Sequence, residues 1–390
     1  MQKEKLVPAI RFKGFKEEWK ISRLCETALK FDNLRVPVAE SLRIKGVFPY
    51  YGANGVQDYV SGFTHNGEFV LIAEDGANDL DSYPSNYVNG KFWANNHVHV
   101  LQGIKGTIDN KFLNYLFKNI DFKPILTGGD RAKLTASALD TINIKAPIFN
   151  EQRKIGLLLN NIDQLLLSQK SKLENLQTIK QSLLDKMFAL YDQKVPEIRF
   201  KGFDESWKLN KFSDLYNCSN EKNINIRYTE KNIISVANMY FKDEQKISNA
   251  EYLKSYNIFH LGDIAYEGNK SANYRYGRFV VNTIGPGIVS HVFEVFKPVM
   301  KEYDLYFWKY YINSESIMRN VLRDSTKSAT MMATLVKKDL SNQFIKITSI
   351  AEQQKIGQFF SSLDSLIHSQ EQKLEKLNNI KQALLEKMFC

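Results

Sequence analysis

The stretch that decides the fold is EQRKIGLLLNNIDQLLLSQKSKLENLQTIKQSLLDKMF, Glu151 to Phe188, because the chain contains it twice. The second copy reads EQQKIGQFFSSLDSLIHSQEQKLEKLNNIKQALLEKMF, Glu352 to Phe389. The two copies align without a gap and share 21 of their 38 residues. A repeat of this length indicates a chain built from two related halves.

Apolar residues recur in both copies with the alternating spacing of four and three residues that is typical of a coiled coil. The series runs from Ile155 to Met187 in the first copy and from Ile356 to Met388 in the second. A polar residue interrupts each series twice, at equivalent positions: Gln169 and Lys180, then Gln370 and Lys381. The pattern predicts two long helices that pair with each other. The alternative is two amphipathic helices, each packed on a domain of its own.

The order of the segments favours antiparallel pairing. The first helix carries the chain from one half to the other, and the second helix brings it back. We therefore expect a pseudo-twofold arrangement in which Gln169 and Gln370 meet near mid-helix and fix the register. A helix of 38 residues would be about 57 Å long, which suits a spacer between two domains. Eight residues are assigned to the spacer: Ile155, Leu159, Gln169, Leu173, Ile356, Phe360, Gln370 and Leu374.

A second, shorter repeat precedes each variable part of the chain. VPAIRFKGFKEEWK, Val7 to Lys20, returns as VPEIRFKGFDESWK, Val195 to Lys208, with 11 of 14 residues shared. We call both copies the RFKGF segments. The blocks that follow them, Ile21–Asn150 and Leu209–Ala351, show no similarity to each other. The repeat predicts two equivalent attachment sites, each of which holds a different domain. The predicted boundaries are residues 1–150 and 191–351 for the domains, and 151–190 and 352–390 for the helices.

The variable blocks read as mixed α+β domains with curved sheets. Short alternating apolar and polar runs are broken by Gly and Asn, with turns expected at Asn54-Gly55 and Asp75-Gly76. Helical spacing occurs at Ile108–Ile120 and near Tyr303–Ile312. The fold class is therefore α+β, with two domains joined and separated by two long antiparallel helices.

The charge balance favours a polyanionic partner. The net charge is +10 and the calculated isoelectric point is about 9.1, which fits nucleic acid. The helical copies carry little of this excess, so the contact is assigned to the variable blocks. Polar, basic loops occur at Gly128–Thr135 and Arg323–Met332, and suit phosphate and base-edge contacts. The candidate DNA contacts are Tyr50, Tyr51, Asn54, Arg131, Lys133, Arg323, Lys327 and Ser328.

Several other classes of site find no support in the sequence. The three cysteines lie far apart, which argues against a disulfide scaffold and a cysteine-based zinc site. His97 and His99 alternate along a predicted strand without an evident acidic or cysteine partner, so no metal is expected. No P-loop and no adenine-methyltransferase motif occurs. No signal peptide or long apolar run is found, so a cytoplasmic protein without a membrane partner is expected.

The combined pattern resembles the specificity subunits of type I restriction-modification systems, over essentially the whole chain. The similarity rests on the doubled architecture, on the EQxKIG helix starts at Glu151 and Glu352, and on PYYGANG at Pro49–Gly55. The segments IAEDGAN and NNHVHVL also resemble sequences from the target-recognition domains of that family.

The resemblance implies a non-catalytic chain without a cofactor of its own. Each target-recognition domain would read one half of a bipartite double-stranded DNA site that has an unspecified gap. The spacer helices would dock two methyltransferase subunits, which use S-adenosylmethionine to methylate adenine N6. Two nuclease subunits, which use ATP and Mg, would join for restriction.

Two other functions fit parts of the sequence. One is a structural or adhesive coiled-coil protein with two β-rich heads, and the other is a stand-alone DNA regulator. The lack of a secretion signal and the basic heads weigh against the first. Co-purification separates all three, because only a specificity subunit should bring a methyltransferase with it.

Overall fold

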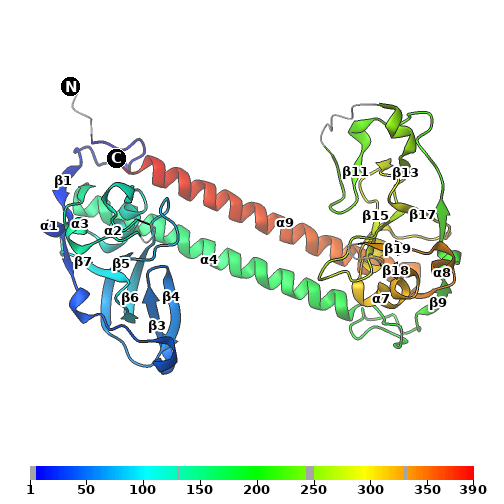
Figure 1. The fold of residues 1–390 in the computed structure, drawn as a ribbon, viewed down its shortest axis with the longest axis horizontal. Helices are drawn as coiled ribbons and strands as arrows, with labels where there is room; N and C mark the ends of the chain where they lie inside the picture. The colour runs from blue at the N-terminus through cyan, green and yellow to red at the C-terminus, as the bar shows by residue number, and fades with distance from the viewer. Residues whose placement is uncertain (1–5, 130–131, 243–249, 329–331) are drawn as a thin grey trace. The chain divides into compact units, whose positions relative to one another are not determined.

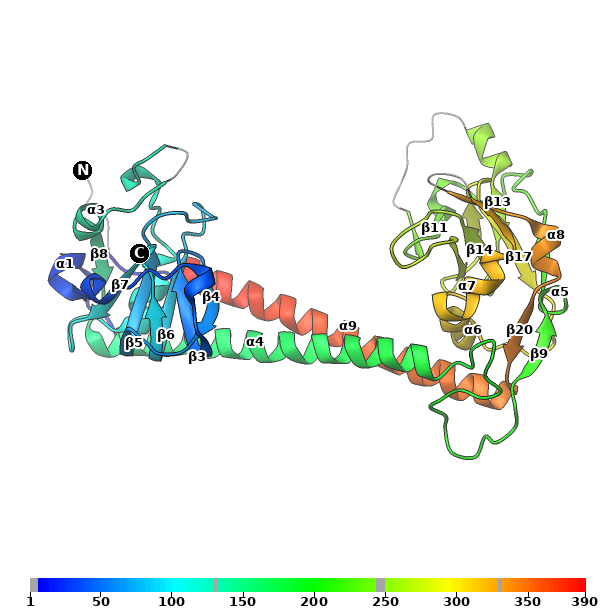
Figure 2. The same ribbon diagram turned by 60° about the horizontal axis from the view of Figure 1, so that its bottom comes forward.

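The chain is described by a computed structural model at residues 6–129, 132–242, 250–328 and 332–390, and it divides into two compact units (Figures 1 and 2). Unit 1 comprises Met1–Ser171 and Gln372–Cys390, and unit 2 comprises Lys172–Glu371. Each unit contains one variable block and parts of both long helices. The candidate Arg131 lies outside the described residues.

Unit 1 is organised around a six-stranded sheet with the strand order β2-β7-β5-β6-β3-β4. Neighbouring strands run antiparallel, except that β3 and β6 are parallel. The strands are β2 (Ala28–Lys30), β3 (Lys45–Gly52), β4 (Gly55–Val60), β5 (His65–Ala73), β6 (Ser85–Ala94) and β7 (Val98–Gly103). A separate pair, β1 (Lys20–Arg23) and β8 (Asn143–Ala146), joins the two ends of the block.

The central strand of unit 1, β5, explains how the sheet is buried. Val70, Leu71 and Ile72 are at most 1% exposed, which matches the continuous apolar run in the sequence. Val70 and Ile72 pack into the cluster that contains α2 (Asn110–Phe117), whereas Leu71 packs into a smaller cluster on the other face. Short helices complete the unit: α1 (Leu24–Thr27), η1 (Asp32–Leu34), η2 (Glu40–Leu42), η3 (Lys123–Ile125) and α3 (Ala136–Asp140).

Unit 2 has a four-stranded antiparallel sheet with the order β10-β17-β14-β15. These strands are β10 (Tyr216–Ser219), β14 (Ile264–Glu267), β15 (Arg278–Val281) and β17 (Glu294–Pro298). Four two-stranded pairs accompany it: β9 (Lys208–Lys211) with β20 (Phe344–Ile347), β11 (Ile234–Ser235) with β12 (Tyr240–Phe241), β13 (Asn257–Phe259) with β16 (Gly287–Val289), and β18 (Thr326–Ser328) with β19 (Ala333–Leu335). The helical elements are η4 (Glu230–Asn232), α5 (Phe212–Leu215), η5 (Ala250–Ser255), α6 (Leu305–Tyr311), α7 (Glu315–Arg323) and α8 (Lys337–Ser341).

The two long helices are α4 (Phe149–Lys186) and α9 (Ile350–Lys387), each of 38 residues. The positions of the 4-3 series are buried or half-buried along their whole length, and exposed residues lie between them. In unit 1 the beginning of α4 lies beside the end of α9, and unit 2 contains the converse pairing. The predicted α+β class with an antiparallel helix pair is thus confirmed. Each helix also enters the core of both units, so the alternative of one helix packed on each domain is excluded.

Candidate nucleic-acid interface

A bidentate ion pair fastens each RFKGF segment to the start of a long helix. In unit 1, the guanidinium of Arg11 donates to both carboxylate oxygens of Glu151, at 2.7 and 2.8 Å. Arg199 and Glu352 make the same contacts in unit 2, at the same distances. Both glutamates are fully buried, and a buried carboxylate requires such a partner. The hydrogen bond to glutamate raises the pKa of each arginine. In each unit, the RFKGF segment and the start of a long helix are therefore held together by this ion pair. We call this contact the joint.

Gly156 and Gly357 let each long helix approach the first turn of a domain helix. Asp109 and Asp304 cap α2 and α6, and their side chains accept backbone N–H groups at 3.0 and 2.7 Å. A β-carbon on Gly156 would lie 2.9 Å from the Asp109 carboxylate, and one on Gly357 would lie 2.3 Å from that of Asp304. The glycine of EQxKIG is thus required for close contact between the spacer and the domain.

The core of each domain contains the last turn of one long helix and the first turns of the other. At the end of α9, Phe389 stacks on Phe112 and meets Trp19 edge-on, with centroids 5.4 and 6.0 Å apart. At the end of α4, Phe188 contacts Trp207 in the same way, at 6.5 Å. These phenylalanines and the tryptophans of the RFKGF segments are buried. Both domain cores therefore depend on both long helices.

A three-residue cluster links the helix pair to the domain in each unit. Asp163 on α4 accepts a hydrogen bond from Tyr115 at 2.6 Å and forms an ion pair with Lys381 of α9 at 2.6 Å. Unit 2 repeats the cluster at the same distances with three equivalent residues: Asp364, Tyr310 and Lys180. Burial and the hydrogen bond to aspartate raise the pKa of both tyrosines. The lysines that interrupt the apolar series are thus ion-paired across the helices.

At one edge of unit 1, three segments meet that are distant in the sequence. The amide of Asn54, in the β3–β4 turn, donates to the carbonyl of Gly76 at 3.0 Å and accepts from the Asn78 N–H at 2.9 Å. The Leu134 N–H donates to the carbonyl of Glu74 at 2.7 Å. The structure therefore brings Asn54 together with the segment that contains the candidate Lys133, and it uses the Asn54 amide to hold the β5–β6 loop.

A network of charged side chains lies beneath this edge. Glu74 accepts from Arg35 at 2.6 Å and from Lys133 at 3.0 Å. Asp32 faces His99 Nδ1 at 2.6 Å, and the other nitrogen of His99 faces the Leu134 carbonyl at 2.8 Å. Burial would raise the pKa of Asp32, but its hydrogen bonds from His99 and from the Val100 N–H outweigh burial and lower it.

This network does not fit a metal site. Asp32, Glu74 and His99 approach one another closely enough to share an ion. However, two protein cations, Arg35 and Lys133, already neutralise Glu74, and His99 uses both ring nitrogens. His97 lies before β7 rather than on it, and it pairs with Asp75 instead of sharing a ligand position with His99.

The two candidate tyrosines of β3 differ in accessibility. Tyr50 is only 1% exposed, its hydroxyl accepts the Val38 N–H at 3.0 Å, and the guanidinium of Arg43 lies over its ring. Its side chain cannot touch DNA in this structure, because the segment that contains Val38 and Arg43 covers it. Tyr51 is half-buried and packs edge-on against Phe92. Tyr50 is therefore corrected from a DNA contact to a residue that supports the hairpin.

In unit 2, the candidates Arg323, Lys327 and Ser328 lie at the end of α7 and on β18. Lys327 is exposed, while Arg323 donates to the adjacent Asp324 at 2.7 Å. The β18–β19 hairpin contacts a loop that the sequence did not single out, residues 268–277. The Ala333 N–H donates to the Gly268 carbonyl at 2.8 Å. A run of Asn, Ser, Tyr and Arg without an acidic residue was the available signal in the sequence.

The eight assigned spacer residues divide into two groups. Ile155, Leu159, Ile356 and Phe360 are at most 1% exposed and belong to the domain cores, so they are not available to a partner. Gln370 is 2% exposed, and three residues are half-buried: Gln169, Leu173 and Leu374. The exposed apolar residues of the helices lie elsewhere. They include two repeat-related pairs: Leu165 with Leu366, and Ile179 with Ile380.

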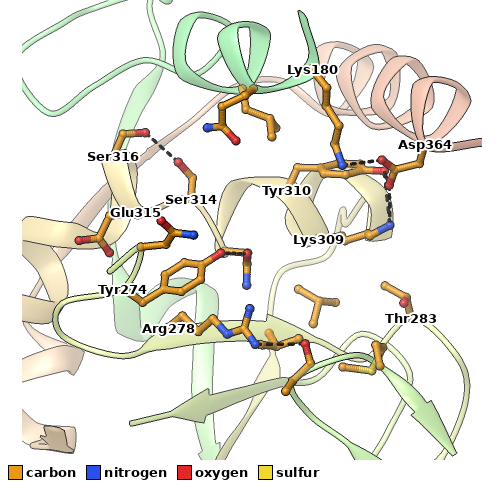
Figure 3. Close-up of a pocket in the computed structure, with 18 of the residues that line it drawn as sticks. Lys180, Tyr274, Arg278, Thr283, Lys309, Tyr310, Ser314, Glu315, Ser316 and Asp364 are labelled. Carbon is orange, nitrogen blue, oxygen red and sulfur yellow. Dashed lines mark hydrogen bonds and ion pairs between the residues drawn. The ribbon is translucent and has the colours of Figure 1, made fainter. Parts of the chain in front are cut away.

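A cavity of about 730 Å³ opens in unit 2 between α4 and the domain (Figure 3). On one wall, Lys180, Lys309 and Tyr310 converge on Asp364. Tyr274, Arg278 and the start of α7 form the other walls. Lys180 and Lys309 are therefore neutralised by Asp364 within the lining, whereas Arg278 pairs with Glu267, which lies outside it.

The family profile described as the type I restriction modification DNA specificity domain matches residues 16–178 and 204–379. A Haemophilus influenzae protein named as a type I restriction enzyme specificity subunit is 49% identical over 152 residues. That match spans 39% of this chain and 39% of the relative, so it covers well under half of the relative's length. The crystal structure of a type I restriction-modification S subunit from M. genitalium has the same fold, with a TM-score of 0.64 at 14% identity. That match covers 98% of this chain and 99% of the other.

Among the described residues, no helix is both long and apolar enough to span a membrane.

Proposed function

Because the chain belongs to the type I restriction-modification DNA specificity family, we propose that each unit reads one half of a bipartite double-stranded DNA site. Members of this family are specificity subunits and have no catalytic activity of their own. The two variable blocks are attached to the long helices through equivalent ion pairs. This supports the proposal, since one scaffold can then hold two surfaces that recognise different DNA sequences.

The charge distribution also supports DNA as the ligand. Residues 151–188 and 352–390 together contribute +2, whereas the whole chain carries +10, which leaves 10 − 2 = +8 for the rest. Neutralising phosphates with Lys and Arg supplies most of the sequence-independent affinity for DNA. The exposed Lys327 on β18 then has the properties of a half-site contact.

We propose further that the helix pair docks two methyltransferase subunits. In unit 1, Leu165 and Ile380 are 44% and 42% exposed, and they lie next to the Asp163–Lys381 ion pair in the sequence. In unit 2, Leu366 and Ile179 are 45% and 51% exposed, and they neighbour the Asp364–Lys180 pair. Repeat-related exposed apolar residues are what two copies of one partner would require.

The cofactors belong to the partners in this proposal. The methyltransferase would use S-adenosylmethionine to methylate adenine N6, after rotating the base out of the stack. Two nuclease subunits that use ATP and Mg would join the complex for restriction. The helices α4 and α9 would set the length of the unspecified gap between the half-sites, as dimer geometry sets spacing in other DNA-reading proteins.

The repeated apolar residues of the helices carry the docking proposal, and co-purification tests it. The double variant Leu165→Asp with Leu366→Asp should lose a co-expressed methyltransferase on affinity purification. The matched control is Glu174→Asp with Glu375→Asp, which changes two exposed and repeat-related positions conservatively. Unchanged recovery of the methyltransferase with the Leu165/Leu366 variant would exclude this docking surface.

A further inference from the structure

The loop Gly268–Gly277, which joins β14 to β15, presents polar side chains from a fixed backbone. Asn269, Ser271 and Arg275 are exposed. Tyr274 points the other way, and its hydroxyl donates to the Asn313 side chain at 2.8 Å. The loop contains Lys270 and Arg275 and no acidic residue, so its net charge is positive. This composition is suited to an anionic ligand.

Several contacts hold the loop in place before any ligand arrives. Ser271 and Tyr274 exchange backbone hydrogen bonds at 3.1 and 3.3 Å, which closes a tight turn. The hydroxyl of Tyr266 donates to the Tyr276 carbonyl at 2.7 Å. Gly277 adopts a φ of +77°, and a β-carbon there would lie 2.5 Å from the Glu267 carbonyl oxygen. A preorganised loop loses less conformational freedom on binding.

Backbone contacts join the start of the loop to Met332 and Ala333, at the start of β19, the strand that pairs with β18. Asn269 bridges to Met332, and a β-carbon on Gly268 would lie 2.3 Å from the Ala333 carbonyl oxygen. Lys327 is exposed on β18 of the same hairpin. Residues of types that can read base edges therefore lie on a segment that is connected, through β19, to the strand that carries a residue suited to a phosphate contact.

We propose that Gly268–Gly277 is a base-reading element of unit 2, in which Asn269 and Arg275 contact base edges and Lys327 contacts the backbone. Arg pairs in a bidentate manner with guanine, and Asn with adenine, in the major groove, while Ser can pair with either. This inference rests on the proposed function, and it names the residues that determine one half-site. Asn273 is excluded from it, because this residue lines the cavity described above.

The test uses the full chain, co-expressed with its methyltransferase in a host without other adenine methylation. Methylated motifs are mapped for the wild type, Asn269→Ala, Arg275→Ala and Arg275→Lys. Each alanine variant should relax or change one position in a single half of the motif and leave the other half intact. Arg275→Lys should also relax it, because lysine cannot make the bidentate contact. Binding to a duplex with the wild-type motif should weaken roughly 5- to 100-fold for the alanine variants.

Lys201→Ala is the control, since Lys201 is an exposed basic residue on the RFKGF segment of the same unit. Its motif should be unchanged. An unchanged motif and unchanged affinity in both alanine variants would overturn the inference, even with a bipartite wild-type motif. Loss of methyltransferase co-purification in these variants would also overturn it, because the loop would then be a protein-docking site. A wild-type complex without a bipartite motif would contradict the proposed function itself.

Discussion

Arg11 and Glu151 form a bidentate ion pair between two segments that are 140 residues apart, and Arg199 and Glu352 repeat it over 153 residues. The pair explains why the RFKGF segment and the EQxKIG helix start occur together in both halves. Each variable block is inserted between the two sides of this joint. The block can therefore change in sequence while the joint stays the same.

Breaking one joint should destabilise one unit. In Arg199→Ala, the fully buried Glu352 loses its cationic partner, which is expected to cost about 3–5 kcal/mol. Urea unfolding measures the change in the free energy of unfolding. The exposed neighbour Lys201→Ala should stay within about 0.5 kcal/mol of the wild type. Equal stabilities for the two variants would show that the ion pair does not hold the joint.

Adding one methyl group at the spacer–domain contact should also be costly. Gly357→Ala places a β-carbon 2.3 Å from the Asp304 carboxylate, so the helix must shift, and the expected loss is about 1–3 kcal/mol. A glycine-to-alanine change in an unobstructed helix would instead stabilise by up to about 1 kcal/mol. The sign of the change in melting temperature distinguishes the two cases. Asn378→Ala, at an exposed position of α9, is the control.

Removing the aromatic ring at the end of α9 should destabilise unit 1 rather than unit 2. Phe389 is packed against Phe112 and Trp19, and Phe389→Ala is expected to cost about 3–5 kcal/mol. Limited proteolysis with identification of the fragments shows which unit opens first. Phe188→Ala should reverse the order of cleavage. Lys387→Ala, in the same last turn but exposed, should leave the pattern unchanged.

Acid should weaken unit 1 through the network of charged side chains around Asp32 and Glu74. The folded-state pKa of Asp32 is lowered, because bonds from His99 and Val100 outweigh burial, and the pKa of Glu74 is lowered as well. Their stabilisation is complete above the unfolded values of about 4, and it is lost as pH falls through the lowered folded values. Unfolding free energies of the wild type and Asp32→Asn should differ at pH 6 and converge toward pH 3. A constant difference across this range would contradict the assignment.

A lysine that contacts phosphate should affect all sequences alike. Lys327→Ala is expected to weaken binding to specific and unrelated duplexes by similar factors. It should also reduce the slope of log affinity against log salt concentration by about 1. Fluorescence anisotropy of the methyltransferase complex at several salt concentrations gives both quantities. A loss confined to one DNA sequence would make Lys327 a base-reading residue instead.

The helices were predictable because their pattern is long and repeated. Every position of the 4-3 series from Ile155 to Met187 is buried or half-buried, and chain connectivity gives the antiparallel direction. The partners of Lys180 and Lys381 were not predictable, since Asp364 and Asp163 lie between the positions of the series. The recurrence of the two lysines marks them as equivalent, but it does not say which carboxylate each one contacts.

The proposed DNA-contacting surfaces were harder to predict, because they depend on contacts between distant loops. Tyr50 was taken as accessible from its place beside a turn, but contacts with Val38 and Arg43 bury it. Asn54 was selected as a reader, yet its amide holds the β5–β6 loop. The loop at Gly268–Gly277 was missed, since its role follows from the neighbouring β18–β19 hairpin, about 60 residues away in the sequence.

The most direct test of the account is an adenine-methylation map of the host genome, with and without this gene, while the methyltransferase is expressed. The account predicts that removing the gene abolishes methylation at one bipartite motif and at no other. Both half-sites and the length of the gap would be read from that motif. Unchanged adenine methylation with an active methyltransferase present, or the loss of a motif without a gap, would contradict it.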